Sequence, residues 1–281
     1  MASDGDLVLV PALRLVALDA HTGETRWVFE APPDAVGDES VALTDSIGFA
    51  SGGAGWLYAV DLRTGVERWR LELHERPFGL VPSGDLLYFG TRGITPDGLG
   101  AGHAMAVNVR TGREEWRFPI PDAPERPHTG GSTGFPALSA ATTYFTGMSG
   151  RVYALDAQTG AERWQAGNWS IATNQYDTGP VLFDGVLITA RDDGEVLAWD
   201  PETGASRWSA RIGSPVDQPV SDGQQLFVNT SRIYAISSSG RVSWVFPDAV
   251  SEFGFESPPA VADRVVYLVA DDGFYALRAN P

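Results

Sequence analysis

Seven polar residues could form a binding site if the fold brings them together. Each comes just before or at the start of a segment predicted to be a strand, and four of them are carboxylates. Convergent carboxylates in a funnel shielded from water attract a cation or a basic peptide. The alternative interpretation is that they are solvated loop acids of a strongly acidic chain. The seven residues are Glu39, Arg76, Thr133, Asp177, Asp217, Gln218 and Glu256.

A second set of residues combines aromatic rings with basic side chains on the same predicted loops. These residue types are enriched at the centres of protein interfaces. The set therefore predicts a protein-interaction surface, and the alternative is that long loops pack against one another. Its members are Arg126, His128, Trp169, Tyr176, Phe253 and Phe255.

Residue patterns typical of catalysis are few. None of the four histidines has HxH or HExxH spacing, no serine lies in a GxSxG motif, and the absence of cysteine excludes thiolate chemistry. His103 and His128 lie on neighbouring long segments with Asp97 and Glu125, and the four could form a metal site. Isolated surface histidines are the alternative interpretation.

Composition narrows the classes of partner. A formal net charge of −16 disfavours nucleic acid, because binding to a phosphate backbone needs clustered cations. No apolar run approaches the roughly 20 residues that a membrane-spanning helix requires. The first residues also lack the basic and apolar regions of a signal peptide. Abundant glycine (32) and proline (19) suit a fold of many short strands and turns.

The elements that would position these residues come from an internal repeat. Segments such as VYALDAQTGAERW (152–164) recur six times, and successive tryptophans lie 42, 47, 48, 44 and 36 residues apart. Each copy is predicted to be a hairpin, in which an aspartate and a Thr-Gly pair form the turn. The returning strand carries a tryptophan that fills the gap between neighbouring sheets. The repeat tryptophans are Trp27, Trp69, Trp116, Trp164, Trp208 and Trp244.

Two further strands precede each hairpin, so the repeat unit is a four-stranded antiparallel meander. Such units stack in a ring, which predicts an all-β fold: a β-propeller that occupies residues 1–281 as a single domain. We expect seven blades, with six as the alternative. We also expect that the first blade lacks its inner strand and the last its outer strand, and that residues precede Met1 in the natural protein. An unusual ring closure would be the alternative.

The connections predict two different faces. Short, uniform Thr-Gly and Asp-Gly turns lie on one face, which we interpret as architectural. Connections that differ in length and chemistry lie on the other, and binding is usually located on variable loops of a rigid scaffold. The seven polar residues would gather there, at the mouth of the central channel.

The pattern Ala-x-Asp-x-x-Thr-Gly-x-x-x-Trp resembles the tryptophan-docking repeat of quinoprotein-type, or PQQ-like, β-propellers. The resemblance covers nearly the whole chain. That family includes eight-bladed PQQ-dependent dehydrogenases, which have an adjacent cysteine pair and a calcium site, and cofactor-free BamB-type lipoproteins of the outer-membrane assembly machinery. With no cysteine and six to seven repeats, the chain is more similar to the BamB-like branch. The resemblance implies no cofactor, with PQQ or calcium as the alternative, and a periplasmic or extracellular location.

We therefore expect a monomeric, non-catalytic propeller that binds an unknown protein partner through its variable-loop face. The alternative function is that of a small-ligand binder or enzyme that uses the channel mouth, either a PQQ-dependent oxidoreductase or an enzyme with chemistry not recognisable in the sequence.

Overall fold

The computed structural model describes residues 2–3, 5–11, 14–30, 40–52, 55–93, 102–124, 130–167, 178–191, 193–213, 218–230, 232–246, 259–262, 265–270 and 273–278. The chain forms two compact units, described one at a time below: residues 1–136 with 156–161, and residues 137–155 with 162–281. The described residues contain no helix with the length and apolar character needed to cross a membrane.

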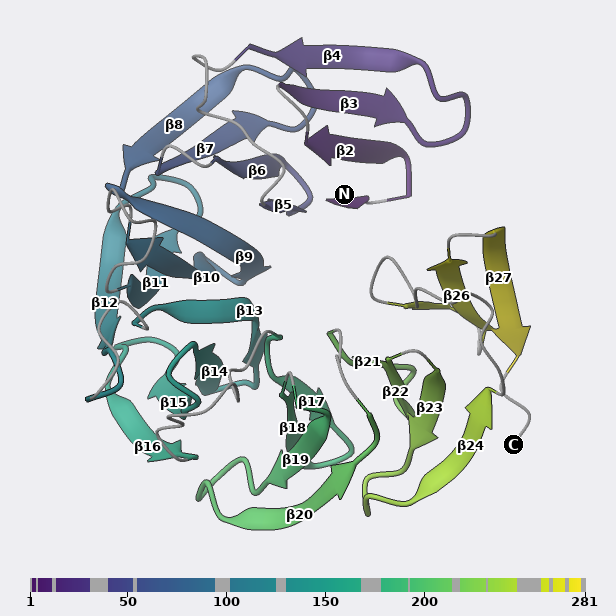
Figure 1. Cartoon of the computed structure of the whole chain (residues 1–281). Coiled ribbons are helices and arrows are strands. Elements are labelled where there is room, and N and C mark those ends of the chain that lie inside the picture. Colours follow the sequence, from purple (N-terminus) through teal and green to yellow (C-terminus); the bar gives the residue numbers. More distant parts are fainter. Residues whose placement is uncertain are drawn as a thin grey trace. The chain divides into compact units, whose positions relative to one another are not determined.

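Seven antiparallel sheets form the blades of a β-propeller (Figure 1). Strands follow one another in chain order within every sheet, because each short connection can only return the chain beside the strand just made. Six sheets have four strands, and the seventh has three among the described residues. The prediction of seven blades is confirmed.

The first unit contains three complete sheets. The first sheet has β1 (Ala2–Ser3), β2 (Leu7–Pro11), β3 (Leu15–Asp19) and β4 (Thr25–Phe29); the second has β5 (Ser40–Leu43), β6 (Ile47–Gly52), β7 (Trp56–Asp61) and β8 (Glu67–Glu72); the third has β9 (Glu75–Ser83), β10 (Leu86–Gly93), β11 (Gly102–Asn108) and β12 (Glu114–Ile120).

The second unit contains the remaining sheets, except that residues 132–136 and the turn 156–161 of the fourth belong to the first unit. The fourth sheet has β13 (Ser132–Leu138), β14 (Thr142–Gly147), β15 (Val152–Asp156) and β16 (Glu162–Ala166); the fifth has β17 (Val181–Phe183), β18 (Val186–Ala190), β19 (Glu195–Trp199) and β20 (Ser206–Arg211); the sixth has β21 (Val220–Ser221), β22 (Leu226–Asn229), β23 (Ile233–Ile236) and β24 (Val242–Phe246); the seventh has β25 (Ala260–Ala262), β26 (Val265–Ala270) and β27 (Gly273–Arg278).

The first sheet corrects one expectation. Its inner strand was predicted to be missing, but β1 pairs with β2, where Ala2 lies opposite Leu9 and Ser3 opposite Val8. Two residues suffice because the edge strand of a sheet needs partners on one side only. A strand this short carries too little pattern to be recognised in a sequence.

Apolar side chains pack between neighbouring sheets of each unit. In the first unit, Phe49, Leu87 and Met105 of the second and third sheets share one fully buried cluster. In the second unit, the fifth and sixth sheets share another, which includes Ile188 and Val228. Every residue of the middle strands β6, β18 and β22 is buried, so both faces of these strands are covered, which explains why they are largely apolar.

The hairpin turns form as the repeat predicts. Oδ1 of Asp156 accepts hydrogen bonds from the backbone N–H groups of Gln158 (3.1 Å) and Thr159 (3.0 Å). Gly160 closes the turn at a φ of 69°, a conformation that favours glycine. In the equivalent turn of the second sheet, the hydrogen bond from Arg68, followed by that from Thr64, lowers the pKa of Asp61 to about 2.

The repeat tryptophans link each hairpin to the next sheet. Five of them donate an indole N–H to a backbone carbonyl of the following turn, at 2.7–3.0 Å: Trp27 to Leu62, Trp69 to Val109, Trp116 to Ala157, Trp164 to Pro201 and Trp208 to Ser238. The glycine of the same turn lies under the ring. A Cβ at Gly160 would be 2.7 Å from the Trp116 ring. For Trp244, the equivalent acceptor would be residue 279, which lies outside the described residues.

The two ends of each sheet differ in their connections. We call the end at which the first strand begins the variable-loop end. It receives the long connections 30–39, 94–101, 121–131, 167–180, 212–219 and 247–259. We call the other the tight-turn end, where the connections are short, as in 62–66 and 157–161. The long connections therefore all lie at the variable-loop end, as the sequence predicts, although that end also has short connections such as 53–55, 73–74 and 148–151.

Candidate functional site

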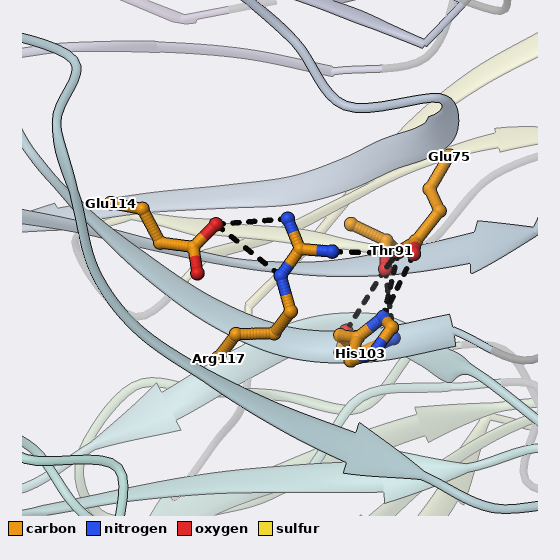
Figure 2. A network of polar contacts seen from close by, with 5 residues as sticks. All are labelled: Glu75, Thr91, His103, Glu114 and Arg117. Atoms are coloured by element: carbon orange, nitrogen blue, oxygen red, sulfur yellow. Dashed lines mark hydrogen bonds and ion pairs between the residues drawn. The ribbon is translucent and has the colours of Figure 1, made fainter.

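A polar network crosses the third sheet at its variable-loop end (Figure 2). Nδ1 of His103 lies 2.9 Å from a carboxylate oxygen of Glu75. The Thr91 hydroxyl donates a hydrogen bond to the same carboxylate and accepts one from the backbone N–H of His103 at 2.8 Å. The side chains of Glu75 and His103 are only 14% and 22% exposed, so they interact where water screens weakly.

Arg117 continues this network toward solvent. Its guanidinium lies 3.6 Å from Glu75 and 2.8 Å from Glu114. Burial raises the pKa of the Glu75 carboxyl, but the hydrogen bonds from His103 and Thr91 and the positive charges nearby outweigh burial and lower it overall. Glu75 is therefore held as a carboxylate.

Strand register brings these residues together. Glu75, the first residue of β9, lies opposite Gly93, the last residue of β10. His103, near the start of β11, lies opposite Pro119 of β12. Gly102 permits the close approach of β10 and β11, since a Cβ there would lie 2.0 Å from the Thr91 carbonyl oxygen. The network therefore fixes the strand ends from which connections 94–101 and 121–131 depart.

The network contains a carboxylate and an imidazole in the arrangement that orients a general base. Its hydroxyl, however, donates to Glu75 instead of to the imidazole, so His103 does not activate Thr91 as a nucleophile. Within the described ranges, no group of three or more histidine, aspartate or glutamate side chains converges in the manner of a metal site. His128, Asp97 and Glu125, the predicted metal-site partners of His103, lie outside the described residues.

Two of the seven predicted channel-mouth residues lie on adjacent inner strands of the first unit. Arg76, on β9, is exposed and lies opposite Arg92 of β10, whose guanidinium sits 5.2 Å from the centre of the Phe78 ring. Thr133, on β13, is buried. The two strands touch at glycines, because a Cβ at Gly79 would lie 2.5 Å from the carbonyl oxygen of Gly134.

An aromatic side chain outside the predicted sets lies beside this contact. Phe135 of β13 is 48% exposed, and its Cα is 3.0 Å from the position of a Cβ on Gly79. One feature of the segment STGFPAL could have indicated Phe135: it follows Gly134, and a glycine allows the neighbouring strand to approach closely. Alternation within β13 alone does not predict that this ring faces solvent.

A third predicted residue, Gln218, contacts the backbone of the neighbouring sheet in the second unit. Its Oε1 accepts a hydrogen bond from the N–H of Gly179 at 2.7 Å, and its Nε2 donates one to the carbonyl of Gly179 at 3.0 Å. The amide thus reproduces the pairing of a strand and ties the entry of β21 to that of β17.

The other predicted site residues lie outside the described residues. For the channel mouth these are Glu39, Asp177, Asp217 and Glu256. For the interaction loops they are Arg126, His128, Trp169, Tyr176, Phe253 and Phe255.

The tight-turn end of the first unit contains two grooves that the sequence did not indicate. One, of about 620 Å³, lies between the second and third sheets and includes Asp45, Asp85 and Arg110 in its wall. The other, of about 380 Å³, lies between the first and second sheets and shares Asp45. Their open, charged walls resemble the spaces between turns of adjacent blades more than the mostly apolar pockets that enclose small ligands.

Known proteins with similar sequence or structure are propellers. A family model described as outer membrane protein assembly factor BamB matches residues 1–128, 100–167 and 148–278. A search of the curated proteins finds no match. BamB from Moraxella catarrhalis is 19% identical, with a TM-score of 0.57, and the alignment covers 98% of this chain and 97% of that one.

Enzymes of the same fold are similar in structure as well. A europium-containing methanol dehydrogenase is 13% identical, with a TM-score of 0.78 over 97% of this chain and 74% of that one. A quinohemoprotein alcohol dehydrogenase from Comamonas testosteroni is 14% identical, with a TM-score of 0.58 over 94% and 68%. At these identities the structural likeness shows the fold alone.

Proposed function

The chain belongs to the family of the outer membrane protein assembly factor BamB, and from this membership and the geometry we propose that it is a non-catalytic scaffold. In this proposal it binds a protein partner through the variable-loop ends of its sheets. The observation that carries the proposal is the contrast between those ends and the tight-turn ends. Tight turns are fixed by repeated side-chain bonds, whereas the long connections differ in sequence and depart from anchored strand ends.

The third sheet supplies the most detailed support. Glu75, His103 and Arg117 hold the strand ends beneath two long connections without presenting an activated nucleophile. Anchored strand ends favour a binding surface, because backbone that is already ordered loses no further conformational entropy when a partner binds. Exposed Arg76 and Phe135 provide residue types that are frequent in protein interfaces.

The chemistry of the partner follows from the predicted loop residues. The aromatic and basic residues Arg126, His128, Trp169, Tyr176, Phe253 and Phe255 are the proposed contacts. The carboxylates at positions 39, 177, 217 and 256 favour a partner segment that carries lysine or arginine, in line with a net charge of −16. The family's role in the assembly of outer membrane proteins supports a periplasmic or extracellular location, and we propose that the chain acts there as a monomer.

Site-specific photo-crosslinking tests the proposal on one sheet. Arg76 at the variable-loop end and Arg110 at the tight-turn end are both exposed residues of the third sheet. A photoreactive amino acid at position 76, in cells that express the full chain, is expected to give a discrete protein adduct. The same group at position 110 is expected to give none. Equal adducts from both positions, or adducts from position 110 alone, would contradict the proposal.

The alternative function is that of a quinone-dependent enzyme, because dehydrogenases have a similar fold. The chain has no cysteine for the vicinal pair that the resemblance implies in such enzymes. Added PQQ and calcium, together and separately, should leave the melting temperature and absorption spectrum unchanged. A saturable thermal shift with PQQ would favour the enzyme, and a shift with calcium alone would favour a cation site at the channel mouth.

A further inference from the structure

The first strands of the seven sheets carry almost no charged side chains. Among those described, only β9 has any, namely Glu75 and Arg76. The two point to opposite faces of the sheet, because neighbours in a strand alternate. Glu75 belongs to the network with His103 and Arg117, and Arg76 lies on the other face. In a chain with 36 acidic and 20 basic residues, a cation on such a strand is distinctive.

A second arginine lies on the same face of the third sheet. Arg92 of β10 is directly opposite Arg76, and side chains at opposite positions of an antiparallel pair share a face. The Arg92 guanidinium lies over the ring of Phe78, 5.2 Å from its centre, and Nε of Arg92 donates a hydrogen bond to the Ser132 carbonyl at 3.4 Å. These contacts hold the guanidinium in place. Like charges at opposite positions disfavour the fold, so an anion close to both arginines stabilises the pair.

A β-bulge in β9 lies next to these residues. Between the pairs Tyr88–Val81 and Gly90–Phe78, β9 has one residue more than β10. Gly79 lies within the bulge at a φ of 66°. Bulges redirect the side chains beside them and are frequent next to active sites. The bulge in β9 thus adjoins Phe78, the ring that supports the second arginine.

An exposed apolar side chain lies close to the arginines. Phe135 of β13 is 48% exposed, and its Cα lies 3.0 Å from the position of a Cβ on Gly79, three residues after Arg76. Arg76 is exposed as well. Both side chains are exposed in the structure of all 281 residues, so the rest of the chain leaves them accessible. The residues involved belong to the first unit, where they combine positive charge with an aromatic surface.

We propose that Arg76, Arg92 and Phe135 bind a segment of the partner protein in which an acidic side chain lies next to an aromatic one. The carboxylate accepts hydrogen bonds from the guanidinium groups, and the aromatic ring packs on Phe135. Charge complementarity selects this occupant, because a protein with a net charge of −16 repels an acidic segment unless local cations bind it. The inference rests on the proposed scaffold function and adds an acidic contact to the basic segment proposed above.

The test uses the full chain and two dye-labelled peptides that differ only in charge, GSFEFEGS and GSFQFQGS. Each peptide is titrated with protein and followed by fluorescence polarisation. We expect saturable binding of the acidic peptide, about tenfold or more tighter than that of the neutral one, because its hydrogen bonds are charge-assisted. Added salt should reduce the difference. Equal binding of the two peptides, or no saturable binding of the acidic one, would overturn the proposal.

Three protein variants at exposed side chains locate the contact. Arg76→Glu should weaken binding of the acidic peptide about tenfold or more, because it removes one hydrogen-bonding cation and adds a like charge. Phe135→Ala should weaken both peptides. Arg110→Glu makes the same charge change at the tight-turn end of the third sheet and should alter neither. Melting temperatures show that the variants are folded. Equal losses in Arg76→Glu and Arg110→Glu would reveal an effect of net charge alone and refute the site.

The outcomes separate this inference from the scaffold function. A photoreactive group at position 76 removes one guanidinium but keeps the proposed loop contacts, so an adduct there still tests the scaffold. An adduct without a preference for the acidic peptide would keep the scaffold and overturn the acidic contact. A preference that Arg76→Glu abolishes, without an adduct in cells, would support the site and count against the scaffold.

Discussion

Glu75 and His103 lie 28 positions apart in the sequence and 2.9 Å apart in the structure. From the sequence, His103 is expected beside residues of the long loops instead, because binding is usually located on loops. In a meander, β9 and β11 begin at the same end of the sheet, so the proximity of the two residues could have been predicted. What could not be predicted is the register, since one residue of slip would turn either side chain to the other face.

The buried carboxylate gives the first prediction. Because its folded-state pKa is lowered, the ionised form of Glu75 stabilises the fold above its ordinary pKa of about 4.3, and this contribution is lost as the pH falls through the lower folded value. Glu75→Gln should therefore melt below the wild type at pH 7, with a gap that closes in acid. Calorimetry across this range checks it. Glu72→Gln, at a half-exposed side chain, serves as the control, and a gap independent of pH would count against the assignment.

Gln218 is predicted from the sequence to contact a ligand, but in the structure its side chain links two strands. Gln218→Ala would leave the buried N–H and C=O of Gly179 without this partner. We expect a loss of about 1–3 kcal/mol in the free energy of unfolding, measured by urea denaturation. Gln165→Ala, at an exposed position of β16, should change it by less than about 0.5 kcal/mol. Unchanged stability in Gln218→Ala would contradict this structural role and would leave Gln218 as a candidate ligand contact.

At the scale of elements, the hairpin turn and the tryptophan form one unit. The sequence predicted both parts because a glycine four positions before a tryptophan recurs in all six copies, five of which also have a threonine before the glycine. It did not predict that the turn glycine of one sheet lies against the tryptophan of the preceding sheet. That contact appears only once the sheets are stacked, and it gives the glycine two requirements: a positive φ and the absence of a Cβ.

Two glycines of the second unit separate these requirements. Gly204 (φ 71°) and Gly185 (φ 73°) share the same backbone conformation, but only at Gly204 would a Cβ meet an indole, 2.6 Å from the Trp164 ring. Alanine at either position costs about 1–2 kcal/mol for the left-handed backbone. Gly204→Ala should cost about 1–3 kcal/mol more, because the indole is displaced. Chemical denaturation of both variants measures the difference, and equal losses would mean that the tryptophan contact contributes nothing.

The repeat tryptophans differ in how far they are buried, and we expect their contributions to stability to differ accordingly. Trp116 is 6% exposed and donates a hydrogen bond to Ala157 at 3.0 Å. Trp116→Ala should lower the free energy of unfolding by about 3–5 kcal/mol, and Trp116→Phe by less, since most of the ring volume remains. Trp164 is only half-buried, so Trp164→Ala should cost less than Trp116→Ala. The reverse order in thermal denaturation would disagree with the packing described.

At the scale of the whole molecule, family and fold agree with what the repeat predicts, because tryptophans spaced 36–48 residues apart can be recognised even where single strands are too short to recognise. The binding chemistry is less predictable. Most of the proposed contacts lie on connections whose sequences do not repeat, so no copy of the repeat constrains another. Membership in the BamB family therefore supports the class of function, while the partner must be found by experiment.

The most direct test of the proposed scaffold shortens one connection and leaves the rest of the third sheet in place. Residues 93–101 are replaced by Asn-Gly, a two-residue turn that joins Arg92 to Gly102 in the register that β10 and β11 already have, and the yield of the photo-crosslinked adduct at position 76 is measured. If the variable-loop end binds the partner, the adduct is lost while the melting temperature stays close to that of the unshortened chain. An adduct of unchanged yield in a folded variant would contradict the account.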